Sequence, residues 1–251
     1  MIIKQLKEWT KGVRLYIALA AVLIAAEVWW WATAVYGSSN LATIRMQEVY
    51  AWLALGLMTV AVFIGPTLKL FPKLPGKGLL RDARRMLGIS GAGFAALHVG
   101  IAYIALFKLP NPTTLADSYQ KAFLLGAVAL VILLLMAFTS FDRAFHKMGI
   151  WWFRLHRLVY VALLLALLHA FMIGSHAVGW PALITVALAA VVLLAFHVIL
   201  MLRHERPGNL QVITITYAVL FAAAVLNYGL SQHLGYNILL NSHKEDTHVE
   251  G

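Results

Sequence analysis

The histidines are the residues in this sequence whose type and position most suggest chemistry. Ten occur in 251 residues; His98, His169 and His197 lie inside long apolar runs, and His156 lies at the start of the run that contains His169. An ionisable side chain is costly inside an apolar segment that crosses a membrane, so each is a candidate functional residue. A neutral imidazole binds a metal through one ring nitrogen and also carries protons. The alternative is that each histidine only hydrogen-bonds a neighbouring helix.

His98 and His169 lie at matching depths in their runs. His98 comes 13 residues after Arg85, and His169 comes 12 residues after Arg157. At about 1.5 Å per helical residue, both lie roughly 18–20 Å from these basic anchors. On parallel helices the two imidazoles can share one level of the membrane, as a six-coordinate b-type haem requires. Small residues one or two turns away would leave room for a macrocycle; they are Gly91, Ala95, Ala102, Ala162 and Ala166.

Membrane-spanning helices are the elements that must position these histidines. The sequence is 62% hydrophobic and only 12% charged, with a mean hydropathy of +0.81, which excludes an ordinary soluble domain. A span needs about 20 apolar residues. Seven runs qualify, the two shortest with help from flanking interfacial residues: 15–35, 49–70, 86–107, 122–138, 155–173, 181–202 and 212–230. The sequence therefore predicts an all-α polytopic membrane bundle of about seven transmembrane helices.

The basic residues predict the orientation of this bundle, because loops rich in lysine and arginine stay on the cytoplasmic side. Sorting the 20 basic residues by predicted loop places 16 on one side and leaves 4 on the other, namely Arg45, Lys108, Lys121 and Lys244. The N-terminus is therefore expected inside and the C-terminus outside. The net charge of +10 then reflects topology and contact with anionic lipid, and no nucleic-acid partner is expected.

Several kinds of site are excluded or disfavoured. Cysteine is absent, which excludes thiolate iron–sulfur clusters, thiolate zinc sites and thioether-linked haem. The segment from Gly91 to Ala96 fits a dinucleotide-binding loop by spacing, but it lies in an apolar run and follows no predicted strand. Its glycines are better explained as a small face that admits another helix or a flat ligand. No residue is assigned a catalytic role.

A series of motifs in the middle of the chain carries a resemblance. They are Arg84-Arg85-Met-Leu-Gly88, Leu97-His98, Tyr103, Ala137-Phe-Thr139-Ser140, Lys147-Met-Gly149, Trp152, Leu155-His156-Arg157, Tyr160 and His169. Together they resemble the ferric reductase-like transmembrane domain family, and within it the MsrQ (YedZ) type, the haem-binding membrane subunit of a methionine sulfoxide reductase system. The resemblance covers about residues 48–200 and is most specific from Ala137 to His169.

This resemblance implies haem b as the cofactor and iron as the metal. His98, His169 and His156 match the haem residues of the family and are the expected metal ligands. One haem is expected at the level of His98 and His169, and a second, toward the inner surface at His156, is left open. His156 and His169 lie 13 residues apart, about 20 Å along a helix, but roughly 140° apart around an ideal one. A local distortion, tilt or different partners must reconcile the two levels.

The inner level shows only one histidine ligand. Arg84 and Arg85 occupy the matching positions of the third run, and a guanidinium is better suited to a haem propionate or anionic lipid than to iron. His197 could supply the missing ligand, or instead bridge helices or handle protons, and His146 in the short loop before the fifth run is another candidate ligand. Trp151 and Trp152 are expected first as interfacial anchors, although they could also line a quinone or FMN site.

The resemblance also implies the partners and the location. Electrons are expected to come from a separate donor on the cytoplasmic side, a flavin, reductase or quinol, since the sequence ends without flavin and nicotinamide domains. They would reach an acceptor on the outer side, such as a periplasmic oxidoreductase. The chain would be an electron-transfer subunit, an oxidoreductase component, in the lipid bilayer of a bacterial inner membrane.

The expected organisation has three parts. Residues 1–47 form an N-terminal anchor helix and outer loop, 48–205 the haem-binding core, and 206–251 an additional helix and outer tail, which exceeds the six spans of MsrQ-like proteins. Two alternatives remain open at this point. One is a self-contained metalloreductase that acts on ferric iron or another small acceptor. The other is a transporter or structural bundle whose histidines bind no haem.

Overall fold

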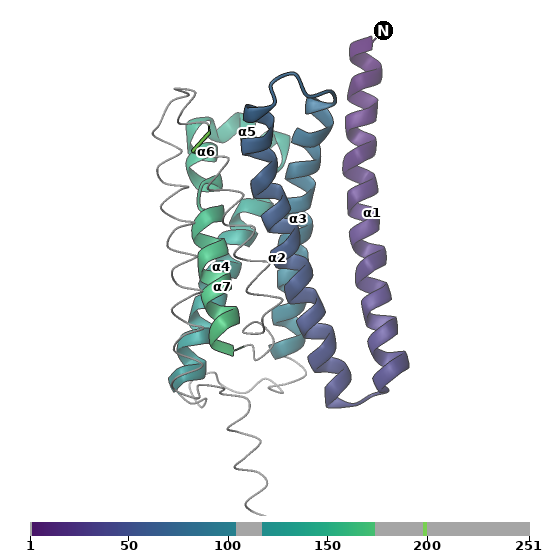
Figure 1. Cartoon of the computed structure of the whole chain (residues 1–251), viewed down its shortest axis with the longest axis vertical. Coiled ribbons are helices and arrows are strands. Elements are labelled where there is room, and N and C mark those ends of the chain that lie inside the picture. The colour runs from purple at the N-terminus through teal and green to yellow at the C-terminus, as the bar shows by residue number, and fades with distance from the viewer. Residues whose placement is uncertain (1, 104–116, 174–197, 200–251) are drawn as a thin grey trace, which may run out of the picture. The chain divides into compact units, whose positions relative to one another are not determined.

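The computed structural model describes residues 2–103, 117–173 and 198–199. Within them the chain is helical, with no strand (Figure 1). The helices are α1 (Ile2–Tyr36), α2 (Asn40–Leu70), α3 (Lys77–Ile101), α4 (Asp117–Phe138), α5 (Asp142–Met148), α6 (Ile150–His156) and α7 (Val159–Ile173). The all-α prediction is confirmed for this part of the chain. The last two predicted spans, apart from Val198 and Ile199, lie outside the described residues.

Four helical segments among the described residues are long and apolar enough to cross a membrane: Gly12–Tyr36, Asn40–Leu70, Gln120–Phe138 and Ile150–Ala170. They correspond to the first, second, fourth and fifth predicted spans. The third prediction corresponds to α3, which is not among the four. Its first nine residues carry five charges, and it is described only as far as the start of the gap at residue 104. The number of spans therefore stays a prediction.

Taken over the described residues, the chain divides into two compact units. The first lies within Met1–Thr114 and Leu130–Val159, and the second within Leu115–Ala129 and Tyr160–Gly251. Helix α4 belongs to both, with its first half in the second unit and its end in the first. His98 and His156 lie in the first unit and His169 in the second.

The core of the first unit lies where α1, α2 and α3 pack together. Tyr50 of α2 and Phe94 of α3 have ring centroids 5.9 Å apart, and small or flexible residues of α1 and α2 surround them. The Tyr50 hydroxyl donates to the carbonyl of Ala25 in α1, at 2.7 Å. This bond satisfies the one polar group of a side chain that is only 2% exposed. It therefore also fixes the axial position of α1 against α2.

Four charged residues join α1, α3 and α5 at one end of the first unit. Arg14 of α1 pairs with Asp82 of α3 and lies 3.3 Å from Asp142 of α5, which also pairs with Arg85. The hydrogen bond from Arg85 is the main reason that the pKa of Asp142 is lowered, and Arg14 adds to the effect. Because an ionised carboxylate bridges two arginines, the three segments lie at the same end of the unit. The charge pattern of the sequence predicted the same grouping.

Two local features shape the segment that carries His156. Gly149 lies between α5 and α6 with φ +52° and ψ −121°, a backbone conformation that a residue with a Cβ rarely adopts. The predicted fifth span, 155–173, is not one helix, because α6 ends at His156 and α7 begins at Val159. The amide of Leu158 bonds three residues back to Leu155, at 2.9 Å, in a tighter turn than an α-helix. His156 and His169 therefore lie on separate helices.

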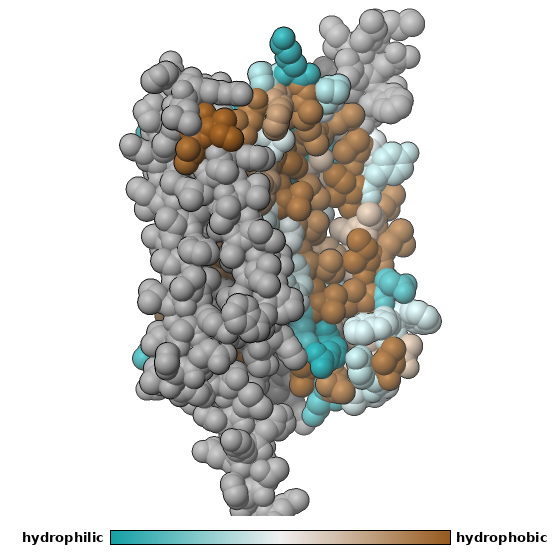
Figure 2. Space-filling model, in the orientation of Figure 1, coloured by the Kyte–Doolittle hydropathy of each residue, from teal (hydrophilic) through white to brown (hydrophobic). Residues whose placement is uncertain are grey.

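The face of α1 seen in Figure 2 is mostly hydrophobic. Large apolar side chains are exposed along the helix, including Leu15, Leu19, Val22, Leu23 and Val35, together with the tryptophans at 29, 30 and 31. A water-soluble protein would bury such a surface, whereas a bilayer solvates it. The exposed aromatics near the end of α1 fit the interfacial position at which tryptophan is enriched.

Candidate functional site

His98 lies near the end of α3, and its ring faces α2. Its Nδ1 is 3.0 Å from the backbone carbonyl oxygen of Gln47. A carbonyl only accepts hydrogen bonds, so Nδ1 must carry the hydrogen in this contact. In a neutral imidazole the other nitrogen, Nε2, then carries the lone pair. The contact with α2 thus selects one tautomer of His98.

His169 makes the same kind of contact in the second unit. It lies on α7, and its Nδ1 is 2.8 Å from the carbonyl oxygen of Ala122 in α4. Ala122 and Ala162 are both fully buried there, so the two helices approach closely. Gly126 lies one turn after Ala122, and a Cβ at this position would be only 2.7 Å from Nδ1 of His169. The carbonyl again leaves the lone pair on Nε2.

This shared geometry fits the ligands of a haem iron. A histidine that binds a metal usually donates its other ring N–H to a carbonyl or carboxylate, which fixes the ring and raises its basicity. The Nδ1 atoms of His98 and His169 lie on carbonyls, and their Nε2 atoms carry the electron pair that iron needs. The donor chemistry of both residues is therefore that of an axial haem ligand.

The chain contacts both ring nitrogens of His156. Its Nδ1 lies 3.0 Å from the carbonyl oxygen of Trp152, and its Nε2 lies 3.2 Å from Oγ of Ser140. The ring also stacks on Trp152, with centroids 3.7 Å apart and planes 21° apart. The ring is thus held on an aromatic face with no nitrogen left uncontacted. Iron could bind Nε2 only if the Ser140 contact were exchanged.

The Ser140 hydroxyl has two acceptors within reach. Its oxygen lies 2.6 Å from the Met136 carbonyl at the end of α4, besides the contact with Nε2 of His156. A neutral His156 that donates from Nδ1 has a lone pair on Nε2. Ser140 must then donate its single hydroxyl hydrogen to Nε2 and has none left for the Met136 carbonyl. The three contacts can form together only if the ring carries both hydrogens and is an imidazolium. Ser140 therefore links the end of α4 to the protonation state of His156.

The two arginines of the predicted propionate site lie near this histidine. The guanidinium of Arg84 packs against Gly65 of α2, since a Cβ at Gly65 would be 3.3 Å from its Nη1. Arg85 pairs with Asp142. Arg84, Arg85 and His156 therefore all belong to the first unit, where Asp142 balances the charge of Arg85.

The predicted site residues are thus distributed over three places. Arg84, Arg85 and His156 share a region of the first unit, and His98 lies on α3 of the same unit. His169 lies in the second unit, so its pairing with His98 stays a prediction. His197 lies outside the described residues. In the described part of the chain, no three histidine or acidic residues converge as a metal-binding group.

Several residues of these environments are not apparent from the sequence. Gln47 and Ala122 each contribute a backbone carbonyl, so no pattern of side chains in the sequence marks them. Trp152 was expected as an interfacial anchor, and its Nε1–H does bond the Thr139 carbonyl, at 2.8 Å. The spacing of four residues between Trp152 and His156 could have indicated the ring stacking, because such residues share a helix face.

At Gly91, a small residue near His98, the structure decides between the two expected neighbours. Gly91 was expected to make room for a macrocycle or a helix, and α2 fills that space. A Cβ at Gly91 would lie 3.1 Å from the Met58 side chain and 3.3 Å from the Ala54 carbonyl oxygen. The helix alternative is therefore confirmed at this position. The glycine allows α3 to pack on α2, and this packing brings the His98 ring toward the Gln47 carbonyl.

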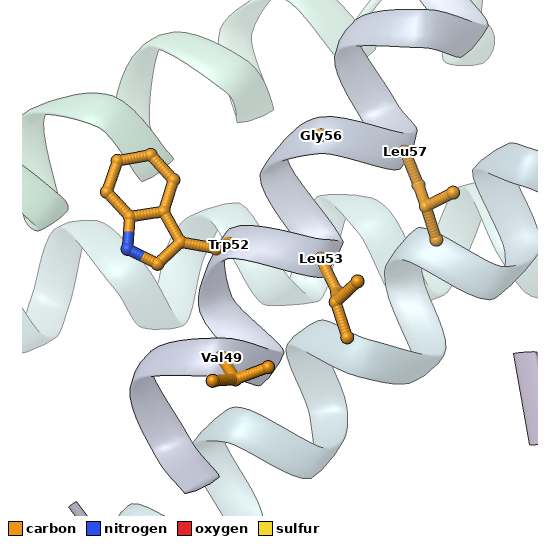
Figure 3. Close-up of a pocket in the computed structure, with 5 residues that line it drawn as sticks. All are labelled: Val49, Trp52, Leu53, Gly56 and Leu57. Carbon is orange, nitrogen blue, oxygen red and sulfur yellow. The ribbon is translucent and has the colours of Figure 1, made fainter. Parts of the chain in front are cut away.

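A separate apolar groove lies along α2. It is lined by Val49, Trp52, Leu53, Gly56 and Leu57, which lie on one side of the helix (Figure 3). None of these side chains titrates or has the lone pair of a typical metal ligand, so the groove offers no chemistry of its own. It is distinct from the contacts of His98, His156 and His169.

Comparison with known proteins identifies the family. The family described as "Ferric reductase like transmembrane component" matches residues 50–167, a range that includes His98 and His156 and ends just before His169. "Protein-methionine-sulfoxide reductase heme-binding subunit MsrQ" of Cronobacter sakazakii is 32% identical over 154 residues, which are 61% of this chain and 74% of that protein. The MsrQ of Pasteurella multocida is 35% identical over 52% of this chain.

The chain spans only part of some relatives. It covers 64% of the Pasteurella MsrQ and 19% of "Magnetosome protein MamZ" of Magnetospirillum gryphiswaldense, which is 37% identical over 128 residues. No solved structure matches the chain. The match to the Cronobacter protein nevertheless extends over most of that relative, and the motifs around His98 and His156 fall within the matched family region. This integral membrane protein therefore belongs to the ferric reductase-like transmembrane family and is similar to its MsrQ members.

Proposed function

We propose that this chain is a b-type haem subunit that carries electrons from a donor on the cytoplasmic side of a bacterial inner membrane to an acceptor on the outer side. The observation that carries this proposal is that the Nδ1 atoms of His98 and His169 each contact a backbone carbonyl. The MsrQ relatives, described as heme-binding subunits, support the same cofactor.

His98 and His169 are the proposed axial ligands of one haem, each through Nε2. Bound haem iron would accept and release one electron at a time. The chain holds each ring by its second nitrogen, so that the ligand does not reorient when the charge on the site changes. Ala122, whose carbonyl oxygen contacts His169, is fully buried, so water would have little access to this contact. Low water access keeps electrons from leaking to solvent-borne acceptors.

The region of Arg84, Arg85 and His156 is the proposed entry point for electrons. The arginines would bind anionic groups there, such as haem propionates or the phosphate of FMN. A second haem at His156 would require Nε2 to exchange its contact with Ser140 for iron, with His197 as the proposed opposite ligand. Without that exchange, His156 and Trp152 would form one wall of a quinone or flavin site at the same end.

The proposed topology follows the basic residues. Seven spans would place the N-terminus inside and the C-terminus outside, with the haem core at 48–205 between an anchor at 1–47 and an added helix and tail at 206–251. The ion pairs of Arg14, Asp82, Arg85 and Asp142 support one common end for the segments expected inside. The proposed outer acceptor is a periplasmic oxidoreductase that repairs oxidised methionine, as the names of the relatives suggest.

Absorption spectra of the purified protein test this proposal. The oxidised and dithionite-reduced spectra would be recorded with haem-to-protein ratios for the wild type, His98→Ala, His169→Ala and His156→Ala. His146→Ala is a matched control, because His146 is an exposed histidine of α5. We expect sharp b-type bands that both His98→Ala and His169→Ala abolish and that His146→Ala retains.

The haem ratio separates the two stoichiometries. A ratio near two that falls to about one in His156→Ala would support the inner haem, whereas a ratio near one that His156→Ala leaves unchanged would assign His156 to the donor site. A colourless wild-type protein, after expression with ample haem, would refute the electron-transfer function. Retention of full haem in either His98→Ala or His169→Ala would refute the ligand pair.

A further inference from the structure

We infer that Gly126 is a positioning residue for His169, which lets the imidazole reach the Ala122 carbonyl and so present Nε2 to iron. The inference rests on the proposed haem function, and it concerns a residue on a different helix from the ligand. Its starting point is the very close approach between α4 and the His169 ring. A Cβ at Gly126 would lie 2.7 Å from Nδ1, 2.9 Å from Cε1 and 3.1 Å from Cγ of His169.

Helix geometry explains why the glycine is at position 126. In an α-helix the carbonyl of residue 122 points toward the amide of residue 126, and a Cβ at 126 tilts back toward the same turn. A side chain there would cover the side of the Ala122 carbonyl that the ring uses. The Nδ1 atom of His169 lies 2.8 Å from that oxygen. Only a residue without a Cβ leaves this approach open.

The position of Gly126 also predicts which group would move. The three atoms nearest to such a Cβ all belong to the ring of His169, which is the far end of a flexible side chain. Rotation of the imidazole would therefore relieve the clash without separating α4 from α7. Gly126→Ala should fold with its helices in place, but with the His169 ring displaced from the Ala122 carbonyl.

Loss of this hydrogen bond has a defined consequence for a metal ligand. The bond holds the ring in one tautomer and raises the basicity of Nε2, which stabilises ferric more than ferrous iron. Without it, haem should bind more weakly and its reduction potential should become more positive. Replacing such supporting groups typically weakens metal affinity by about 10–100-fold. A residue that only packed two helices would change stability without moving the potential.

The matched control is Gly93→Ala. Gly93 is also a helical glycine in this protein, but a Cβ there would meet nothing within 4 Å. Haem affinity, the haem midpoint potential and the thermal midpoint in detergent would be measured for the wild type and both variants. We expect weaker haem binding and a more positive potential in Gly126→Ala, and wild-type haem affinity and potential in Gly93→Ala. Wild-type affinity and potential in Gly126→Ala would overturn the inference.

A double-mutant cycle on haem-free protein provides a test that needs no cofactor. In a His169→Ala background the ring that meets the new Cβ is gone, so Gly126→Ala should no longer lower the thermal midpoint. An equal loss in both backgrounds would show that the two residues do not interact and would overturn the positioning role. A wild-type protein that binds no haem would refute the proposed function together with the role toward iron. The cycle distinguishes that failure from a failure of the geometry.

Discussion

At the scale of single residues, the type of a partner decides what a ring nitrogen of histidine can do. Nδ1 contacts a backbone carbonyl in His98, His156 and His169, and Nε2 of His156 contacts the Ser140 hydroxyl. A backbone carbonyl cannot change its role, so it fixes the tautomer of His98 and His169. A hydroxyl can donate or accept, so Ser140 tolerates both forms of His156. The chemistry open to a histidine here depends on the type of its partner.

Ser140→Ala tests this contact. The variant removes the hydroxyl that joins the end of α4 to the His156 ring, and we expect the free energy of unfolding to fall by about 0.5–1.5 kcal/mol. Haem content should not decrease, because the hydroxyl competes with iron for Nε2. Denaturation in detergent and the haem-to-protein ratio would measure both effects.

Thr139→Ala is the control for Ser140→Ala. Thr139 follows the end of α4, and among the contacts described its Oγ1 bonds only the α4 carbonyls of Leu135 and Met136. Its removal should therefore change stability less than the removal of Ser140 Oγ. Loss of haem in Ser140→Ala, with retention in Thr139→Ala, would instead mean that the hydroxyl orients a ligand.

At the scale of helices, close packing of α2 on α3 sets the position of His98. A Cβ at Gly91 would lie close to the Ala54 carbonyl oxygen and to the side chains of Met58 and Leu57 in α2. A side chain at Gly91 would have to displace the Ala54 carbonyl. A backbone carbonyl inside a helix cannot rotate away as a side chain can. The separation of the two helices therefore depends on this glycine.

Gly91→Ala and Gly93→Ala should change stability in opposite directions. The first inserts a methyl group 3.3 Å from the Ala54 carbonyl oxygen and should cost about 1–3 kcal/mol. The second meets no atom within 4 Å, and alanine is the better helix former by about 1 kcal/mol. Thermal midpoints of the two variants in one detergent would measure the difference. Equal midpoints would mean that α2 and α3 are not in contact at Gly91.

Helix α5 is held to α1 and α3 by Asp142, and this contact should depend on pH. The Arg85 hydrogen bond lowers the pKa of Asp142, so the ionised form is favoured in the folded protein. Its contribution to stability is present above the ordinary carboxyl range, near about pH 4, and is lost as the pH falls toward the lowered pKa. Asp142 is exposed, so the contribution is small.

Asp142→Asn should make the stability of the folded protein depend less on pH in the acid range. The wild type should lose more stability than the variant between about pH 5 and pH 3, because only the wild type takes up this proton on unfolding. Thermal midpoints at several pH values would measure the two slopes. Glu48→Gln is the control, since Glu48 pairs with Arg45 of its own helix at 2.8 Å. Identical slopes for the wild type and Asp142→Asn would contradict the prediction.

The break between α6 and α7 answers a question that the sequence raised. His156 and His169 would lie roughly 140° apart around one ideal helix. In the structure α6 ends at His156 and α7 begins at Val159, with a turn at Arg157 and Leu158 between them. The angle of one ideal helix therefore does not apply across this turn, and different partners hold the two residues.

At the scale of the whole molecule, the number of spans decides on which side the C-terminus lies. The sequence contains no cysteine, so single cysteines can be labelled without background. We expect a membrane-impermeant maleimide to label Ser38→Cys and Ser242→Cys in intact spheroplasts. Lys147→Cys should react only after the membrane is permeabilised, because Lys147 belongs to the predicted inner side. Labelling of Ser242→Cys only after permeabilisation would mean an even number of spans.

The sequence by itself determined the class of this protein. Its apolar runs are long enough to require membrane helices, its basic residues are unevenly distributed between loops, and its histidine motifs mark the family. These features are local or periodic along the chain, so they can be recognised without a structure. The boundaries of the second and fourth predicted spans agree with the C-terminal ends of α2 and α4, at Leu70 and Phe138.

Only the tertiary structure decided what each histidine contacts. The partners of His98 and His169 are backbone carbonyls about 50 residues away in the chain, and every residue has a carbonyl, so no residue type marks them. Gly126 and Gly91 look alike in the sequence, yet one faces a ring and the other a helix backbone. Such differences arise from the rotation and separation of packed helices, which depend on many side chains together. For that reason a motif can identify a ligand, but only the packing fixes its tautomer and orientation.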